Sequence, residues 1–477
     1  MEFSTTIMLL SALHGTGPGA ESPEHHSRIA CLGRETPISM FLTGTGRGSY
    51  PQVLGRLLRG RFDIRTFRSG GNSYQPSPAT PPGPLLVDTT LLKWNPDLVF
   101  VEPGVVDSGS PGDREGGLTE ASLAGTVTLL GNQRSHPRII LLLPAPASPG
   151  PSARDSLLLG GTIDRIRSVA YSTGCEVIDT HSLLFDGPDH TPGEAMTADR
   201  AAGLVARRLR ELLSGDEAPG IEISRVAPIG SAKSNYYGYE CFEFKFRGRE
   251  AKIVRPKRAA KGFPWIWRAR FWGHEPQTEI ALLERGFHVT YCDAAELFGN
   301  DEALGLWDGF YAALTDAGLS KKAVLEGFSR GGMYVYRWAL HNPGSVACVY
   351  ADAPVLDMKS WPGGKGRGGG NPAEWLRFKY DFALQSEQEA LAFRENPLDR
   401  AQEIAHLGFP MLHICGLADV TVPIGENTDP FEKRILASGG RITVIRKPGI
   451  GHHPHSLPNP RPIVEFILRA VKDAPPG

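Results

Sequence analysis

The segment Gly327–Gly332, which reads Gly-Phe-Ser-Arg-Gly-Gly, carries the strongest chemical signal in the chain. It follows the apolar run 323–325, and this pattern predicts a strand that ends in a sharp turn and leads directly into a helix. Ser329 stands at the apex of the turn, where its hydroxyl is exposed and backbone N–H groups point toward the atom it attacks. Because serine is a weak nucleophile at neutral pH, this chemistry needs a base and an acid elsewhere in the chain.

Two later segments supply an acid and a base in a suitable order. The apolar run 411–415 leads into a loop that carries Asp419, and the run 442–445 leads into a loop that contains His452. Both loops follow predicted strands, and the carboxyl ends of parallel strands are where active sites of such sheets lie. In this arrangement histidine takes the serine proton, while aspartate holds the imidazole tautomer and stabilises the imidazolium.

The base is one of three neighbouring histidines. His452 directly follows Gly451 and fits the expected Gly-His pattern best. His453 and His455 are alternatives for the base, or they line the substrate pocket or cap the following helix.

The region after residue 220 has the elements that would position these groups. Its opening predicts two antiparallel strands at 239–246 and 249–254. Further strands are predicted at 264–268, 288–292, 323–326, 346–351, 410–415 and 441–446, with helices between them at 276–285, 301–317, 332–341, 426–437 and 461–471. Segment 355–408 interrupts this alternation and is rich in glycine and aromatic residues, so we expect a lid or pocket insertion there, with Trp361 among the substrate-binding residues.

Residues 220–470 thus resemble the α/β-hydrolases, in which a Ser-Asp-His order follows the strands of one sheet. The resemblance implies an oxyanion hole made by the N–H of the residue after the nucleophile, here Arg330, and by an N–H from the loop after an earlier strand. That second donor would come from segment 267–270, which includes Trp267 and Arg268. This segment lacks the His-Gly pattern of many esterases.

Three arginines, Arg268, Arg270 and Arg330, can approach the mouth of this site. One that points inward would favour a substrate with a carboxylate or a polarised ester carbonyl, and we count Arg270 as substrate-binding. The alternative is that they pair with local carboxylates such as Glu326 or Asp352. An arginine directly after the serine resembles the glucuronoyl esterases, and the following Gly-Gly is similar to prolyl-oligopeptidase-type peptidases.

The region 28–214 alternates strand-like and helix-like segments and predicts a three-layer α/β/α domain with a parallel, flavodoxin-like sheet. Strands are expected at 28–32, 63–67, 98–102, 138–143 and 176–179, and helices at 51–58, 163–172 and 198–213. We expect residues 1–27 to be poorly ordered and the polar segment 215–220 to be a linker before the second domain, 221–477.

This first region resembles the SGNH (GDSL-like) hydrolases in strand order and in its short sequence motifs. The family's Gly-Asp-Ser block falls on Gly33-Arg34-Glu35, so glutamate stands at the serine position. Its second block matches Gly71, and its Gly-x-Asn-Asp block matches 104–107, with Val106 in place of asparagine. The final Asp-x-x-His block falls on 193–196, or on Asp186 or Asp189 with His190. The resemblance therefore implies a domain that kept the fold and lost the chemistry, with binding of a substrate or packing against the second domain as its role.

Composition limits the partners. The 51 basic and 52 acidic residues nearly cancel, which argues against nucleic-acid binding. No segment is long enough to span a bilayer, and the short apolar run 7–10 follows Glu2 in place of a basic region, so it matches a signal peptide only weakly. The six cysteines have no C-x-x-C spacing, and five of them lie in strand-like runs, so we expect buried free thiols and slightly favour the cytoplasm.

The sequence thus predicts a two-domain serine esterase that needs no metal or organic cofactor. Its substrate would be a small-molecule or saccharide ester, with an acylated or methyl-esterified carbohydrate or a plant-derived ester as one class. A serine peptidase or amidase is the first alternative. A non-catalytic binding protein made of two relic hydrolase folds is the second.

Overall fold

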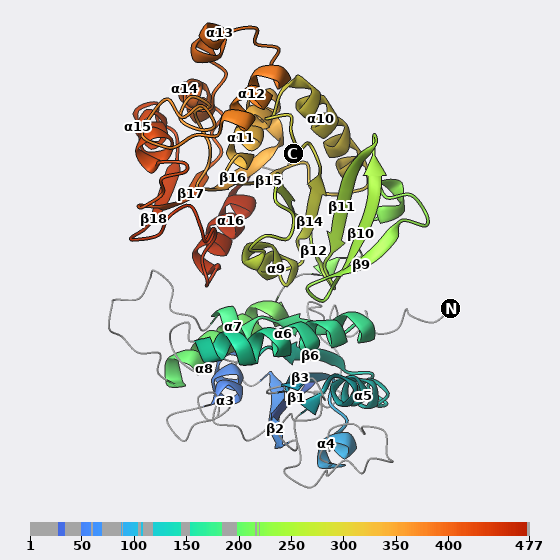
Figure 1. The fold of residues 1–477 in the computed structure, drawn as a ribbon. Helices are drawn as coiled ribbons and strands as arrows, with labels where there is room; N and C mark the ends of the chain where they lie inside the picture. The colour runs from blue at the N-terminus through green and yellow to red at the C-terminus, as the bar shows by residue number, and fades with distance from the viewer. Residues whose placement is uncertain are drawn as a thin grey trace, which may run out of the picture.

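The computed structural model describes residues 27–33, 49–58, 61–68, 87, 89–103, 106–107, 118–144, 153–183, 198–214, 217–218 and 220–474. Figure 1 shows two stacked parts, each built around its own sheet, with the N-terminal part below and the C-terminal part above. The expectation that residues 1–27 are poorly ordered lies, except for Ser27, outside the described residues.

The N-terminal sheet has five parallel strands in the order β2-β1-β3-β6-β7. Their bounds are Ser27–Gly33 (β1), Phe62–Arg68 (β2), Leu98–Glu102 (β3), Arg138–Leu142 (β6) and Glu176–Ile178 (β7). Helices α3 (Tyr50–Leu57) and α8 (Ala198–Ser214) pack on one face. Helices α4 (Thr89–Trp94), α5 (Glu120–Gly131) and α6 (Ala153–Thr173) cover the other, and α7 (Thr180–Leu183) follows β7. This is the strand order of a doubly wound sheet, and the predicted strands are all present.

The resemblance to SGNH hydrolases stays a prediction. The positions that would replace its nucleophile, its second glycine block and its acid–base pair (Glu35, Gly71, Asp186, Asp189, His190 and 193–196) lie outside the described residues. Of the third block, Val106–Asp107 forms the short strand β4, which pairs with β5 (Leu118–Thr119).

The larger sheet has nine strands among the described residues, in the order β18-β17-β16-β15-β13-β14-β11-β10-β9. Their bounds are Ala232–Tyr236 (β9), Tyr239–Phe246 (β10), Arg249–Arg255 (β11), Trp265–Arg268 (β13), His288–Cys292 (β14), Ala323–Phe328 (β15), Val346–Asp352 (β16), Met411–Gly416 (β17) and Ile442–Lys447 (β18). Strands β9, β10, β11 and β14 pair antiparallel, and the pairs from β14 to β18 are parallel. The mixed α/β architecture is confirmed, and this strand order agrees with the α/β-hydrolase resemblance. Strand β9 was not predicted, because its sequence Ala-Lys-Ser-Asn-Tyr is mostly polar.

Helices cover both faces of this sheet. Those on one face are α10 (Asp301–Asp316), α11 (Gly331–His341), α14 (Ala401–His406) and α15 (Thr428–Ala437), and those on the other are α9 (Gln277–Leu283) and α16 (Arg461–Asp473). The insertion between β16 and β17 also contains α12 (Pro372–Asp381) and α13 (Glu387–Ala392). Its aromatic side chains pack with Phe298 and Met333 in a separate apolar cluster. Figure 1 shows α12 and α13 at the end of the molecule farthest from the N-terminal sheet.

The linker prediction needs one correction. Glu217–Ala218, inside the expected linker 215–220, forms strand β8 and pairs antiparallel with β12 (Ala259–Ala260). The polar, glycine- and proline-rich composition predicted a linker. It does not show that the backbone of Glu217–Ala218 pairs with residues about 40 positions later in the chain.

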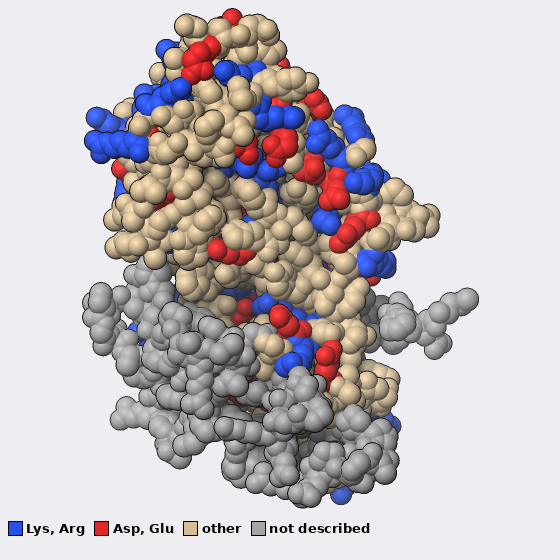
Figure 2. Space-filling view, in the orientation of Figure 1, with Lys and Arg blue, Asp and Glu red and all other residues tan. Residues whose placement is uncertain are grey.

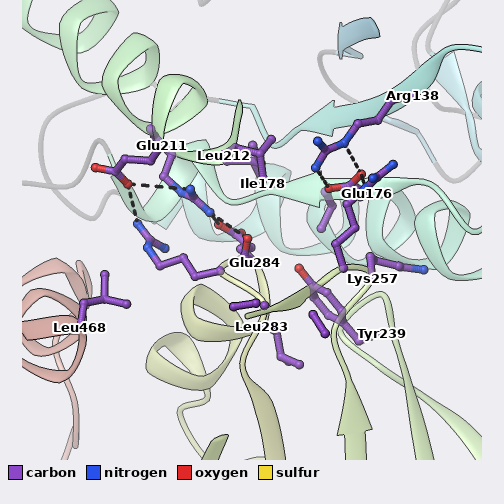
Figure 3. A pocket seen from close by; sticks show the side chains of 17 residues that line it. Arg138, Glu176, Ile178, Glu211, Leu212, Tyr239, Lys257, Leu283, Glu284 and Leu468 are labelled. Carbon is purple, nitrogen blue, oxygen red and sulfur yellow. Dashed lines mark hydrogen bonds and ion pairs between the residues drawn. The ribbon is translucent and has the colours of Figure 1, made fainter. Parts of the chain in front are cut away.

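Ion pairs join the two parts (Figure 3). Glu284 lies beside α9 with a side chain that is 3% exposed, and it pairs with Arg208 of α8 at 3.4 Å while accepting the N–H of Asp179 at 2.6 Å. On the other side of a pocket of about 210 Å³, Glu176 pairs with both Arg138 and Arg258. These contacts link α8 and the edge strand β7 of the first part to the end of α9 and the residue before β12 in the second.

Three expectations from the composition can be compared with the described residues: mixed surface charge, buried cysteines and no membrane-spanning helix. Figure 2 shows acidic and basic side chains interspersed over the described part of one face. All six cysteines are buried and free, as predicted. Within the described ranges, no helix combines the length and apolar character that crossing a bilayer requires.

Candidate active site

Strand β15 ends at Phe328, and Ser329 follows it with a φ of +49°. This left-handed backbone is uncommon for a residue with a side chain and marks a strained turn. Two hydrogen bonds with the neighbouring strand end fix it: Ser329 N–H donates to the Asp352 carbonyl at 2.8 Å, and Val355 N–H donates to the Ser329 carbonyl at 2.9 Å. The predicted strand–turn–helix arrangement is confirmed, and α11 begins at Gly331.

Two glycines permit this turn. A Cβ on Gly327 would lie 2.8 Å from the Gly331 carbonyl oxygen, and one on Gly332 would lie 2.5 Å from the Pro354 Cβ. Both distances are shorter than van der Waals contact, so the backbone of the turn packs more closely than side chains at these positions allow.

Gly332→Ala should therefore destabilise the protein by roughly 1–3 kcal/mol, the usual cost of overpacking. Alanine gains at most about 1 kcal/mol of helix propensity over glycine, which is too little to offset contact with a rigid proline ring. Gly344→Ala is the matched control, because its Cβ would meet no atom within 4 Å. The midpoint of urea unfolding should fall for Gly332→Ala and stay within error for Gly344→Ala. Equal midpoints would show that the turn tolerates a side chain.

Asp419 lies in the loop after β17, where the sequence placed it. Its Oδ1 accepts the N–H groups of Thr421 at 2.8 Å and Val422 at 2.9 Å, and its side chain is 2% exposed. Its Oδ2 lies 2.7 Å from Nδ1 of His452. The loop therefore fixes one carboxylate oxygen and presents the other to the histidine.

His452 lies between Asp419 and Ser329. Its Nε2 is 3.0 Å from Ser329 Oγ, within hydrogen-bond reach. A carboxylate only accepts hydrogen bonds, so Nδ1 of the neutral ring carries the proton and Nε2 is left to accept the serine hydroxyl. The loop of the acid and the loop of the histidine are joined directly, since Ala418 N–H donates to the Ile450 carbonyl at 2.8 Å.

The backbone N–H groups of Arg330 and Arg270, beside the serine, have no acceptor among the described residues. Arg330 precedes α11, whose first N–H groups have no partner within the helix. The loop of Arg270 lies against this turn, because a Cβ on Gly331 would lie 3.8 Å from the Arg270 Cβ.

Trp267 and Arg268 were expected to contribute the second oxyanion donor, and this prediction is wrong. Strand β13 extends to Arg268 and pairs on both sides, so the backbones of both residues belong to the sheet. Ala269 N–H also donates to the sheet, at the Glu326 carbonyl. The first free N–H after the strand is that of Arg270.

The side chain of Arg268 is fully buried beneath the site. It donates to Glu279 at 2.6 Å and to Glu326 at 3.4 Å, which is the carboxylate pairing kept open as the alternative. Burial, followed by the neighbouring Glu279 charge, raises the pKa of Glu326 well above its usual range. Trp267 packs in an aromatic cluster, with its ring centroid 4.6 Å from that of Trp307.

Arg330 and Arg270 also pair with acids, and they share Glu296. Arg330 donates to Glu374 at 2.9 Å and lies 3.8 Å from Glu296, while Arg270 donates to Glu296 at 3.4 Å. Trp361, from the insertion, lies under the Arg330 guanidinium at 5.3 Å. Trp361 thus lies beside the serine turn, and both arginines have carboxylate partners before any substrate arrives.

The other two predicted histidines have different surroundings. His455 is buried, and its Nδ1 lies 2.9 Å from the Asp352 carboxylate. His453 is exposed, and burial followed by the charge of His455 lowers its pKa. Neither caps the next helix, whose N-cap is Pro460. His452 is the histidine that contacts both Ser329 and Asp419.

Sequence reasoning missed His274 and Glu275, which lie beside these histidines. The His274 ring centroid is 5.7 Å from that of His453 and 5.9 Å from that of His455. The two segments are far apart in the sequence, and no local pattern around His274 signals this contact.

Comparisons with known proteins give only distant matches. No family model matches the chain, and no curated protein matches it. Pyrococcus horikoshii acylaminoacyl peptidase is 16% identical with a TM-score of 0.39, over 50% of this chain and 43% of the peptidase. A puromycin hydrolase is 20% identical with a TM-score of 0.36, over 49% and 38%. A putative dipeptidyl aminopeptidase IV from Bacteroides ovatus is 17% identical with a TM-score of 0.37, over 51% and 36%.

The matches span less than half the length of each of these three chains. The α/β-hydrolase resemblance of this chain therefore rests on its own strand order and on the geometry at Ser329.

Proposed function

We propose that residues 220–474 form a serine hydrolase that cleaves a carboxylic acid derivative through an acyl-enzyme. The observation that carries this proposal is the unbroken chain of contacts from Ser329 to His452 at 3.0 Å and from His452 to Asp419 at 2.7 Å. The three residues follow three different strands, at the carboxyl edge of one sheet. Nucleophile, base and orienting acid are the three parts that such catalysis needs.

In the proposed reaction, Ser329 Oγ attacks the carbonyl carbon as its proton passes to His452 Nε2. The charge that develops on the carbonyl oxygen is received by the N–H groups of Arg330 and Arg270. Collapse of the tetrahedral intermediate breaks the bond to the alcohol or amine, which takes the proton from His452. A water molecule, deprotonated by His452, then releases the acid and restores the serine.

Two kinds of bond fit this site. The sequence favoured a carboxylic ester, including an acylated or methyl-esterified carbohydrate. The three similar structures are named as two peptidases and a puromycin hydrolase, but similarity at their level says nothing about the bond that this chain cleaves. An amide substrate is the stronger test of the site, because its leaving group is an amine that His452 must protonate.

A matched pair of substrates separates these possibilities. The p-nitrophenyl ester and the p-nitroanilide of one acyl group release related chromophores, and a methyl-esterified sugar acid tests the carbohydrate class. We expect ester turnover well above that of Ser329→Ala protein, with slower or absent anilide turnover. Anilide turnover that matches or exceeds ester turnover would assign a peptidase or amidase. Failure on all substrates, together with no covalent labelling of Ser329, would leave the binding-protein alternative.

A further inference from the structure

Three histidines from two loops converge beside the proposed catalytic histidine. His274 lies between β13 and α9, whereas His453 and His455 follow β18. One ring nitrogen of each lies within 4.8 Å of the other two. His274 and His453 are exposed, so their rings can turn toward a ligand, and His455 is buried and fixed.

His455 has the surroundings of a metal ligand. Its Nδ1–H donates to Asp352 Oδ1 at 2.9 Å, which leaves a lone pair on Nε2. Asp352 is itself held by the Ser456 N–H at 2.7 Å and the Tyr350 hydroxyl at 3.3 Å. A carboxylate behind a ligating histidine fixes its tautomer and makes the imidazole more basic, and metal-bound histidines almost always donate their other ring N–H to a carboxylate, a backbone carbonyl or water.

A second carboxyl group, that of Glu275, lies at the same place. Glu275 Oε1 lies 3.7 Å from His274 Nε2, and Glu275 Oε2 is buried without a hydrogen-bond partner among the described residues. Of the two cations near Glu275, Arg268 is paired with Glu279, and Lys447 donates to the carbonyls of Pro454 and Ser456. A bound cation would compensate this buried oxygen.

We infer that His274, His453 and His455 form a site for a Zn²⁺-like transition-metal ion, with water as the fourth ligand, and that its occupation inhibits the hydrolase. The inhibitory part rests on the proposed function, and the binding part does not. Three histidines and a water form a familiar tetrahedral zinc site with Zn–N distances of about 2.0–2.1 Å, which places the nitrogens about 3.4 Å apart. Rotation of the exposed rings of His274 and His453 would bring the three ring nitrogens, now within 4.8 Å of one another, to this shorter distance.

Inhibition follows from the distance to the proposed base. The ring centroid of His452 lies 5.0 Å from that of His453 and 4.9 Å from that of His455. Drawing His453 onto an ion moves its chain neighbour His452, whose Nε2 must stay within hydrogen-bond reach of Ser329 Oγ, now 3.0 Å away, for the reaction to proceed. His452 is not itself a ligand in this arrangement, because Asp419 and Ser329 engage its two ring nitrogens.

Equilibrium dialysis of the metal-free full chain with Zn²⁺, and the visible spectrum with Co²⁺, test the site. We expect one ion per chain and the absorption of four-coordinate Co²⁺. His274→Ala and His453→Ala should weaken binding at least about a hundredfold, and Asp352→Asn about 10–100-fold. His406→Ala, an exposed histidine on α14, is the control and should bind like the parent. Binding by His274→Ala and His453→Ala equal to the parent, or no binding by the parent, would overturn the proposal.

The same titration in Ser329→Ala protein separates this site from the hydrolase. Unchanged binding there is expected whether or not the chain is an enzyme. If the chain turns over substrate, Zn²⁺ should lower the rate reversibly, and His274→Ala should raise the Zn²⁺ concentration for half-inhibition by the factor by which it weakens binding. Each variant is compared with its own metal-free rate. Stoichiometric binding without any change in rate would overturn the inhibitory role.

Discussion

Replacing Ser329 with alanine should reduce kcat on any accepted substrate by about 10⁴–10⁶-fold, which is the scale of loss when a serine nucleophile is removed. The substitution deletes one oxygen from a side chain that lies at the turn between β15 and α11. The backbone hydrogen bonds of Ser329 to Asp352 and Val355 do not involve that oxygen. We therefore expect the midpoint of urea unfolding to change little while turnover falls to background.

Ser345→Ala is the matched control for this experiment, because Ser345 lies at the other end of α11, in the turn before β16. It should keep the parental rate. Turnover by Ser329→Ala within tenfold of the parent would exclude an acyl-enzyme on this residue.

Asp419→Asn should lower kcat by about 10⁴-fold, because an amide next to Nδ1 favours the wrong imidazole tautomer and does not stabilise the imidazolium. The amide side chain introduced there can still accept the N–H groups of Thr421 and Val422 through its carbonyl oxygen, so the loop should keep its conformation. Steady-state kinetics on the ester substrate measure the effect, which should fall on kcat more than on KM.

Asp352→Asn is the informative comparison, because the site contains two aspartate–histidine pairs. Asp352 pairs with His455 and not with the histidine that contacts Ser329. Its replacement should disturb only the position of the histidine loop, with a loss of roughly 100-fold at most. If Asp352→Asn costs more than Asp419→Asn, the acid has been assigned to the wrong residue.

The sequence was sufficient to place the proposed catalytic residues, because the signals that mark them lie close to them in the chain. Each of them comes within a few residues of a strand end, and apolar strands of a parallel sheet can be recognised from short runs. Because such strands end at one edge, Ser329, Asp419 and His452 had to lie at the same edge of the sheet. Gly451 before His452 was enough to favour this histidine over its two neighbours.

The predictions that failed depended on which backbone and side-chain groups pair. Strand β13 ends at Arg268, as the sequence predicted, but the N–H of the next residue, Ala269, still donates to the Glu326 carbonyl, so the free N–H is that of Arg270. The sequence marks where a strand ends but not whether the residue after it still bonds to the neighbouring strand. The partners Glu296 and Glu374 of Arg330 lie on separate segments, and only the packing of the insertion brings them together.

Covalent labelling with a fluorophosphonate probe tests the central claim most directly, because the probe reacts with activated serines whatever the natural substrate is. We predict a single adduct per chain, mapped by mass spectrometry to Ser329, that is absent from Ser329→Ala and strongly slowed in Asp419→Asn. Ser345→Ala should label at the parental rate. No adduct on the parent protein, or an equal adduct on Ser329→Ala, would contradict the account.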